Sequence, residues 1–402
     1  MSVSQKSASS GGSGESSPKR KGGEPSLSAS LLLVAPLPKP ARDGHDYRVL
    51  LLKRAEKSST YQNAYVFPGG NVDPIDRDER AWSSYFPSTS TSTDLQTVKL
   101  CAIRETFEES GVLLFEPTSS PDHTRQKEVE EKWRKLDDRT KTKLREEVHS
   151  SGEEFVRIFA KELGQGVRPA VSKLTHWANW VTPLALPRRF DTHFFISILP
   201  SSSSPSASPD DTPYYKLASS DGVETSVAAW LTPSEAIRRA LAHTANLSYP
   251  ETTPTYAEQP RSMGNNPTNS IILHPPQFYL LAELANNHKS WRSLVDGSGN
   301  HVRPRKVRSF TPQIGKVVDE GGKLRPATLL PGDEAFVQGG GGEGKEEERG
   351  KAGVRHRTYV IPPNERTQGL TVLGVHRRGI EDGPGWEDMR AGDIGEQSAS
   401  KL

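Results

Sequence analysis

The sequence predicts an α/β fold in which one sizeable hydrophobic core is interrupted by polar inserts. Short apolar runs of strand length recur between residues 31 and 231, and a segment with apolar residues at helical spacing lies among them. Hydrophobic residues make up 33% of the 402 residues, and the chain carries 34 glycines and 31 prolines. Much of the length is therefore predicted to be loop, insert or tail.

The first strands are predicted near the N-terminus. Leu31–Val34 and Tyr47–Leu52 are apolar runs separated by a turn that is rich in Pro, Gly and Asp. Ala64–Phe67 is a third short strand, which Pro68-Gly69-Gly70 ends. Residues 1–26 contain few apolar side chains, so we expect them to form a disordered tail.

A helix is predicted over Val98–Ser110. Leu100, Ile103 and Phe107 share one face at helical spacing, and Gly111 follows as a natural stop. This apolar face is expected to pack against the core, so the opposite face is left for polar side chains.

The densely charged segment 123–164 carries sparse apolar positions, which predict two or three helices that cover the core. On charge patterning alone, a solvated insert without a chemical role is the alternative. Further strands are expected at Trp177–Val181, Thr192–Leu199 and Ser226–Leu231, and further helices at 233–241 and 277–287.

These elements divide the chain into a core domain and a C-terminal extension. The core domain is expected at residues 27–300, with inserts at about 77–97, 118–170 and 200–213. The extension is expected at residues 301–378 and contains a low-complexity linker at 338–353. Residues 379–402 are predicted to be a flexible tail.

The charge balance and the cysteine content exclude several classes of protein. Lys and Arg total 52 against 50 Asp and Glu, and this net charge of +2 gives no electrostatic basis for a nucleic-acid or membrane partner. The single Cys101 excludes an internal disulfide framework and a multi-cysteine zinc site. The longest apolar run, Leu31–Leu37, is far shorter than the roughly 18 residues of a spanning helix.

The feature that points to chemistry is an acidic face on the predicted helix. Glu105, Glu108 and Glu109 stand at positions i, i+3 and i+4, so they project from one side. Like charges at these spacings repel one another, which costs stability unless a cation offsets them. Carboxylate oxygens suit Mg²⁺ or Mn²⁺, so the spacing indicates a divalent-metal site. An ordinary acidic solvent face is the alternative.

The glycine turn and this helix together resemble the Nudix box, G-x5-E-x7-R-E-U-x-E-E-x-G-U, in which U is apolar. Gly70 matches the opening glycine of the box. Arg104-Glu105, Glu108-Glu109 and Gly111-Val112 match the rest in order and spacing. The chain is therefore similar to the Nudix hydrolase family in its most specific motif.

The box departs from the family pattern in three places. Asp76 stands where the family has glutamate, and Thr106 takes the first apolar position of the helix. The spacer becomes residues 77–103, which is an insert of about twenty residues. A strict pattern search would therefore miss the box, and the role of the family glutamate does not carry over directly to the shorter Asp76.

Segments beyond the box resemble the long Nudix branch that includes peroxisomal coenzyme A diphosphatases. The resemblance covers roughly residues 27 to 375, with inserts. The segments that carry it are Trp180–Pro183, Arg188–Phe195, Glu224, Trp230–Ala236 and Leu329–Glu334. The family implies an α/β/α sandwich with a mixed sheet. It also implies hydrolysis of a nucleoside diphosphate linked to another group, with Mg²⁺ or Mn²⁺ as cofactor.

Carried over to this sequence, the resemblance assigns roles to the acidic helix and the turn. Glu108 and Glu109 are expected to be metal ligands, and Glu105 is expected to be a ligand or the base that orients or deprotonates water. The backbone of Gly70 is expected to offer a carbonyl oxygen to the metal. Arg104 is expected to hold the glutamates in place through ion pairs.

Three candidates lie outside the helix. Many Nudix enzymes take a further carboxylate from a distant loop, and Glu224 is the candidate here, with an exposed strand-edge charge as the alternative. Arg188 and Arg189 are candidates for binding phosphate, because a guanidinium matches phosphate oxygens in pairs. One of the two is expected to pack structurally or to pair with Asp191.

The branch implies hydrolysis of coenzyme A or acyl-CoA to 3',5'-ADP and (acyl-)4'-phosphopantetheine. A diphosphatase for NADH or ADP-ribose is one alternative, and an inactive Nudix module that binds nucleotides or proteins is another. The chain ends in Ser400-Lys401-Leu402, which is a peroxisomal address read by an import receptor. The sequence therefore predicts a peroxisomal protein.

Overall fold

The structure of the protein, a computed structural model, describes most of the chain. The described residues are 23–56, 63–86, 94–119, 122–200, 218–245, 270–297, 301–319, 322–338, 348–361, 370–378 and 389–390. Most of the predicted N-terminal tail and most of the predicted 338–353 linker lie outside them. The predicted 200–213 insert, apart from its first residue, and Ser400-Lys401-Leu402 also lie outside them.

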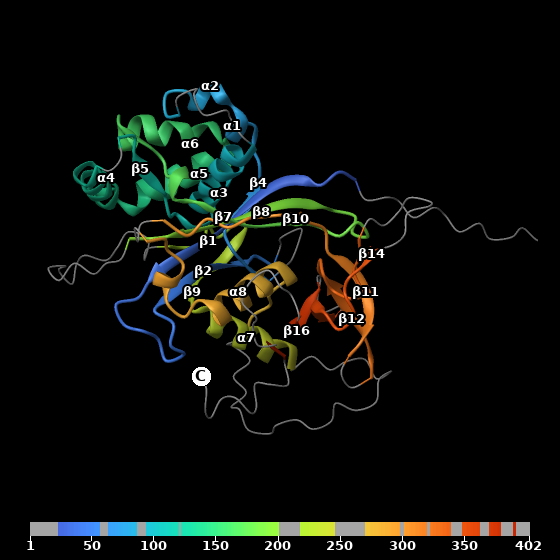
Figure 1. The fold of residues 1–402 in the computed structure, drawn as a ribbon. Coiled ribbons are helices and arrows are strands. Elements are labelled where there is room, and N and C mark those ends of the chain that lie inside the picture. Colours follow the sequence, from blue (N-terminus) through green and yellow to red (C-terminus); the bar gives the residue numbers. More distant parts are fainter. Residues whose placement is uncertain are drawn as a thin grey trace, which may run out of the picture.

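A mixed eight-stranded sheet forms the centre of the molecule (Figure 1). Its strands are β1 (Ser26–Pro36), β2 (Tyr47–Arg54), β3 (Tyr65–Val66), β4 (Gly69–Asn71), β7 (Thr175–Val181), β8 (Phe190–Ile198), β9 (Thr225–Leu231) and β10 (Ser309–Phe310). The order is β10-β7-β8-β1-β2-β3, with β4 paired to β1 and β9 paired to β2. Strand β1 runs parallel to β8, and it runs antiparallel to β2 and β4. The mixed sheet and the helices that cover it confirm the predicted α/β class.

Strand β1 is apolar on both faces because both faces of the sheet are covered. Leu31 and Leu33 belong to one hydrophobic cluster, and Leu32 and Val34 belong to the other. All four side chains are fully buried. Successive side chains of a strand alternate sides, so a continuous apolar run marks a strand without a solvent face.

One layer of helices covers the sheet face on which Leu31 lies (Figure 1). It contains α1 (Pro74–Arg77), α2 (Glu79–Trp82), α3 (Asp94–Ser110), α4 (His123–Lys135), α5 (Asp138–Ser150), α6 (Glu153–Arg157), a π-helical segment (Ile158–Leu163) and a hairpin of β5 (Phe115–Pro117) with β6 (Val167–Pro169). The helices predicted within 123–164 are present, and they are part of the core. Phe155 of α6, for example, packs edge to face against Trp82 and Phe159.

Helix α3 is longer than the sequence pattern predicted. It begins at Asp94, four residues before the expected Val98. Most of this extra turn is exposed or half-buried, so no apolar periodicity marks it. The predicted 77–97 insert contains α2 and the start of α3. The indole of Trp82 anchors α2 by donating to the carbonyl oxygen of Ile75 at 2.9 Å.

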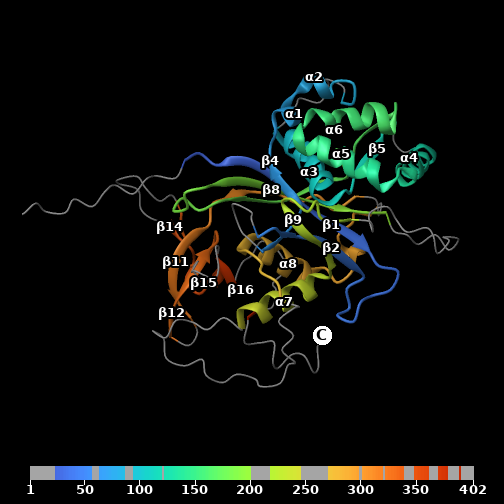
Figure 2. The same cartoon turned by 180° about the vertical axis from the view of Figure 1, so that it is seen from behind.

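The opposite sheet face is covered by α7, α8 and a second sheet from the C-terminal extension (Figure 2). The elements are α7 (Pro233–Ala245), α8 (Pro275–Asn287), β11 (Gln313–Val318), β12 (Leu324–Leu329), β13 (Val337–Gln338), β14 (Glu348–Arg349), β15 (Arg355–Ile361), β16 (Thr371–Arg378) and β17 (Met389–Arg390). The second sheet has the order β11-β12-β15-β16-β17, and β13 pairs with β14 in a separate two-stranded sheet. Val372 and Val375 of β16 join the same cluster as Leu32, so the extension shares the core. Within the described ranges, none of the helices combines the length and the hydropathy that a bilayer span requires.

A buried ion pair fastens the loop after β12 to strand β15. Arg357 donates from Nε to Asp333 Oδ2 at 2.6 Å and from Nη2 to Asp333 Oδ1 at 2.8 Å. Asp333 also accepts from the amides of Ala335 and His356, at 2.9 and 2.7 Å. The motif Leu329–Glu334 that was singled out in the sequence therefore has a structural role, since its aspartate organises this loop.

Candidate active site

The glycine turn brings strand β4 into direct contact with helix α3. A Cβ on Gly69 would lie 2.3 Å from the carbonyl oxygen of Ala29, and a Cβ on Gly70 would lie 2.5 Å from the carboxyl carbon of Glu105. A side chain at Gly69 would therefore clash with backbone, and one at Gly70 would displace the Glu105 carboxylate. The Gly69 amide donates to Glu109 Oε2 at 2.9 Å, which joins the turn to the helix.

Arg104 is buried at the centre of the acidic residues. Its Nη1 lies 3.0 Å from Glu105 Oε1 and 2.6 Å from Glu108 Oε1. Its Nη2 donates to Asp76 Oδ2 at 2.9 Å and to the carbonyl oxygen of Asn71 at 3.0 Å. A guanidinium has five donors in a fixed plane, so one arginine can hold three carboxylates. Arg104 thus lies where the ion pairing expected from the sequence requires it.

Asp76, whose role the sequence left open, is a buried structural residue. Only 2% of it is exposed, and its carboxylate also accepts from Arg104 Nε at 3.0 Å. The same carboxylate accepts from the amide of Asp73 at 2.9 Å, within the capping box of α1. Asp76 therefore links the start of the insert to Arg104, and it acts on the glutamates through that arginine.

The three glutamates of α3 lie in an environment that disfavours their negative charge. Burial raises the pKa of Glu105 to about 8, and the Arg104 guanidinium offsets this only in part. Burial also raises the pKa of Glu108, again against the effect of Arg104. Burial and the nearby charge of Glu105 raise the pKa of Glu109 well above its ordinary value. The site is therefore short of positive charge.

The chemistry of these residues fits a divalent cation. The candidate ligands are all oxygen donors, as Mg²⁺ and Mn²⁺ prefer: the carboxylates of Glu105, Glu108 and Glu109 and the carbonyl of Gly70. A cation would supply the missing positive charge. As the side chains are placed, no three acidic, histidine or cysteine groups among the described residues converge on one metal position. Arg104 instead holds two of the glutamates, and the third accepts from the turn.

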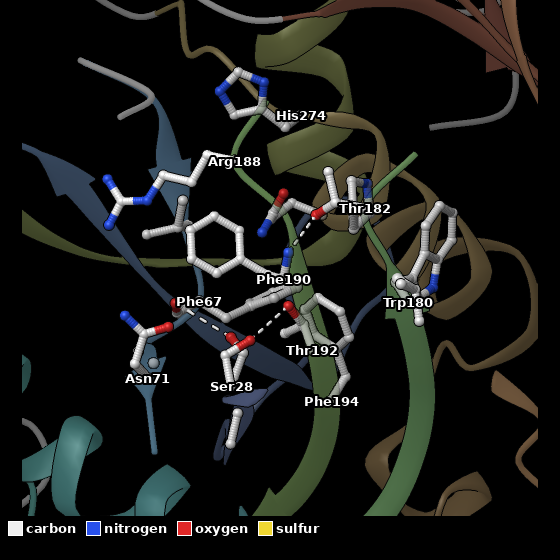
Figure 3. Close-up of a pocket in the computed structure, with 18 of the residues that line it drawn as sticks. Ser28, Phe67, Asn71, Trp180, Thr182, Arg188, Phe190, Thr192, Phe194 and His274 are labelled. Carbon is white, nitrogen blue, oxygen red and sulfur yellow. Dashed lines mark hydrogen bonds between the residues drawn. The ribbon is translucent and has the colours of Figure 1, made fainter. Parts of the chain in front are cut away.

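A cleft of about 1040 Å³ opens beside the acidic helix. Glu105 and the glycine turn line one part of it, and the C-terminal extension lines another. Figure 3 shows Trp180 and Phe190 among the aromatic side chains that border this cleft. The hydroxyls of Ser28 and Thr192, which lie 2.8 Å apart, also line it. The cleft thus combines carboxylate, hydroxyl and aromatic surface in one space.

The structure separates the two candidate phosphate-binding arginines. Arg188 lines the cleft, and its guanidinium carbon lies 5.3 Å from the centre of the Phe190 ring (Figure 3). Arg189 donates to the carbonyl oxygens of Thr182 and Gly23, at 3.1 Å each, and it does not line the cleft. Arg188 is therefore the candidate for substrate contact, while Arg189 anchors backbone.

Glu224 lies just before β9 and lines the same cleft. Its Oε2 is 3.9 Å from Nη2 of Arg54, and its charge contributes to the raised pKa of Glu109. Asp221 shapes this loop, because its Oδ1 accepts from the amides of Glu224 and Thr225 at 3.1 and 2.8 Å. The structure thus places Glu224 beside the acidic helix, with its side chain about half exposed.

The helical insert contributes residues that the sequence did not single out. Arg145 of α5 donates to the carbonyl oxygen of Glu108 from Nε at 3.2 Å and from Nη2 at 3.0 Å. Its Nη1 donates to Ser219 Oγ at 3.1 Å, on the segment that leads to Glu224. His149 Nδ1 lies 3.6 Å from Glu108 Oε2. No sequence signal marks these side chains, because each is one polar residue among many in a charged segment.

A family model and similar sequences point to one family. A family model described as the NUDT19 Nudix domain matches residues 26–99 and 93–254. Acyl-coenzyme A diphosphatase NUDT19 of Xenopus laevis is 31% identical over 274 residues, which cover 60% of each chain, so this chain spans less than two thirds of that relative. Putative nudix hydrolase 7 of Caenorhabditis elegans is 27% identical over 298 residues, covering 72% of this chain and 70% of that one. The crystal structure of a NUDIX hydrolase from Alicyclobacillus acidocaldarius has 18% identity and a TM-score of 0.42, covering 65% of this chain and 91% of that one.

Proposed function

The chain belongs to the family of NUDT19 Nudix domains, whose model spans more than half of its residues, and on this basis we propose that it is a metal-dependent hydrolase of coenzyme A or acyl-CoA. It cuts the pyrophosphate bond and releases 3',5'-ADP and (acyl-)4'-phosphopantetheine. The name of the Xenopus laevis relative, acyl-coenzyme A diphosphatase, supports this substrate class.

One observation carries the proposal: a single cleft joins Glu105 of the acidic helix to Arg188 and Phe190. Coenzyme A has a pyrophosphate, a 3'-phosphate and an adenine base. A guanidinium binds phosphate oxygens in pairs, and an aromatic ring offers a stacking surface. The cleft volume of about 1040 Å³ lies at the upper end of small-molecule sites, as a substrate of this size requires.

The reaction adds water to one phosphorus and breaks the P–O–P bridge, so the oxygen of water enters one product and the bridging oxygen leaves with the other. Mg²⁺ or Mn²⁺, when bound, supplies charge neutralisation at phosphate and lowers the pKa of water. Glu108, Glu109 and the Gly70 carbonyl would hold the ion. The Glu105 carboxylate lines the cleft, where it would complete the ligand set or accept the proton of the attacking water.

Two further residues complete the proposed machinery. Arg104 is a positioning residue, because its ion pairs fix the carboxylates of Glu105 and Glu108 relative to the glycine turn. Glu224 supplies a further carboxylate at the cleft, where it faces the same space as Glu105. In this arrangement Arg188 contacts the phosphates of the substrate.

The test is a hydrolysis assay of the purified full-length chain with Mg²⁺ or Mn²⁺. We expect coenzyme A and acyl-CoA to yield 3',5'-ADP. We expect Glu108→Gln to lower kcat by about 100-fold or more, because it removes a ligand charge without changing side-chain size. Glu128→Gln is the matched control, since Glu128 of α4 is exposed and pairs with Arg125 on the surface.

Three other outcomes would contradict the proposal. Release of AMP from NADH or ADP-ribose, with little turnover of coenzyme A, would show that the proposed substrate is wrong. No turnover of any of these compounds with either metal would identify a binding module. A fully active Glu108→Gln variant would remove the assignment of the metal site.

The proposed enzyme acts in the peroxisome. This part of the proposal rests on Ser400-Lys401-Leu402, which lies outside the described residues. An import receptor would read these three residues at the C-terminus. No nucleic-acid or membrane partner enters the proposal, in keeping with the balanced net charge of +2.

A further inference from the structure

The C-terminal extension forms one wall of the cleft. Ile314 of β11, Thr328 of β12 and Val360 of β15 all line it, together with Pro326. Ile314 and Thr328 are directly paired across β11 and β12, so their side chains share one face. Ala327 belongs to a small hydrophobic cluster on the opposite face. The wall is therefore one face of the second sheet, which lies beside α7 and α8 (Figure 2).

This wall differs from the rest of the cleft in the charge and polarity of its side chains. The charged side chains that line the cleft, among them Glu105, Arg188 and Glu224, come from outside the extension. The described residues that the extension contributes to the lining are all uncharged, and most are apolar. Ile314 is 41% exposed although it is apolar, so it offers surface that a ligand could bury. The extension therefore suits an uncharged, aliphatic part of a ligand.

Two buried polar atoms beside this apolar surface lack a hydrogen-bond partner among the described residues. They are Thr328 Oγ1, in a residue that is 2% exposed, and Gln277 Oε1 at the start of α8. Both residues line the cleft. A buried polar atom without a partner is unfavourable, so a ligand that donates hydrogen bonds here would gain affinity. Amide N–H groups set in an aliphatic chain meet this requirement.

We propose that the extension binds the acyl-pantetheine arm of the substrate, an inference that rests on the proposed function. The arm is an uncharged aliphatic chain that carries two amides. The methylenes of its acyl chain contact Ile314 and Val360, and the amides of its pantetheine part bond to Thr328 and Gln277. The 3',5'-ADP half carries phosphates that need cations, and the described lining of the extension supplies none. That half is bound by the part of the cleft that contains Arg188.

The first test measures how KM depends on acyl-chain length. With acetyl-, octanoyl- and palmitoyl-CoA, we expect Ile314→Ser to raise KM progressively, by about tenfold for the longest chain, because an apolar contact is lost. Val318→Ser is the matched control: Val318 lies on the same strand, is 56% exposed and does not line the cleft. Equal effects of Ile314→Ser on all three chain lengths would overturn the inference.

The second test uses the two product halves as inhibitors. Thr328→Val keeps the shape of the side chain and removes its hydroxyl, so we expect inhibition by 4'-phosphopantetheine to weaken about fivefold. Inhibition by 3',5'-ADP should change less than twofold. The reverse pattern would place the adenosine half on the wall and overturn the inference. If Thr328→Val does not fold, the dependence of KM on acyl-chain length in Ile314→Ser decides whether the inference holds, because Ile314 is partly exposed and its replacement is tolerated more easily.

Failure of the inference can be told apart from failure of the proposed function. A wild-type protein that does not cut coenzyme A at all would overturn the proposed function and the inference with it. An active wild-type enzyme whose chain-length dependence survives Ile314→Ser would overturn the inference alone.

Discussion

Replacing Glu105 with glutamine should flatten the pH dependence of metal binding. Burial raises the pKa of Glu105 to about 8 from an ordinary value of 4.5, while the Arg104 guanidinium lowers it and the charge of Glu108 raises it further. A metal ion and a proton compete for the carboxylate, so each pH unit below this pKa costs about tenfold in apparent metal affinity. Between pH 6 and pH 8, proton release from Glu105 alone should therefore raise the apparent metal affinity about 50-fold.

Isothermal titration calorimetry with Mn²⁺ at pH 6, 7 and 8 measures this effect. The apparent Kd of the wild-type protein should fall by about 50-fold or more over this range, since the pKa values of Glu108 and Glu109 are also raised. Glu105→Gln should show a clearly smaller change, while the exposed-site variant Glu128→Gln should behave as wild type. The same pH dependence in wild type and Glu105→Gln would refute the reasoning.

The raised pKa of Glu105 can also be tested without metal, through the pH dependence of protein stability. The folded state binds the Glu105 proton more tightly than the unfolded state does, because the folded pKa lies above 4.5. Stability from this group is thus fully present below about pH 4.5, and it is lost as the pH rises through about 8. The Tm of metal-free Glu105→Gln relative to wild type should therefore increase from pH 5 to pH 8.5. A difference in Tm that is constant with pH would contradict the assignment.

Three further predictions follow from other parts of the structure. Gly70→Ala should lower kcat/KM by about 100-fold, since its Cβ would lie 2.5 Å from the carboxyl carbon of Glu105. Gly23→Ala should be fully active in the same assay, because a Cβ at Gly23 would meet no atom within 4 Å. Asp333→Asn should lower the free energy of unfolding in urea by about 3 kcal/mol, because the buried Arg357 guanidinium then keeps only the part-exposed Glu334 as its anion, and a loss below about 1 kcal/mol would count against the ion pair. A fluorescent protein fused to the N-terminus should localise to peroxisomes and become diffuse without Leu402, whereas a diffuse intact fusion would rule out the proposed location.

Much of the fold could be predicted because burial leaves a periodic pattern in the sequence. The continuous apolar run Leu31–Val34 predicted a buried strand, and the structure covers it on both sides. Leu100, Ile103 and Phe107 recur at helical spacing, and all three are buried on α3. The first turn of α3, from Asp94, has no such pattern and was therefore missed.

What could not be predicted depends on contacts between residues that are distant in the sequence. Arg104 and Asp76 are 28 residues apart, and Arg145 reaches the Glu108 backbone from 37 residues away. Hydrophobic periodicity says nothing about such polar contacts, because they depend on how the elements pack. Arg188 and Arg189 likewise look equivalent in the sequence. Only the orientation of the chain just before β8 brings Arg188 to the cleft and leaves Arg189 outside it.

The position of β1 has a consequence for the order in which the protein folds. One edge of β1 pairs with β2 and β4, which follow closely in the sequence, while its other edge pairs with β8. Ser28 and Thr192, which face each other across β1 and β8, are 164 residues apart. At about 5 to 20 residues per second, a ribosome needs about 8 to 33 s to make this stretch. During that time the second edge of β1 is an open template for pairing with other chains, and the helical insert is synthesised early enough to shield one face of the strand before β8 exists.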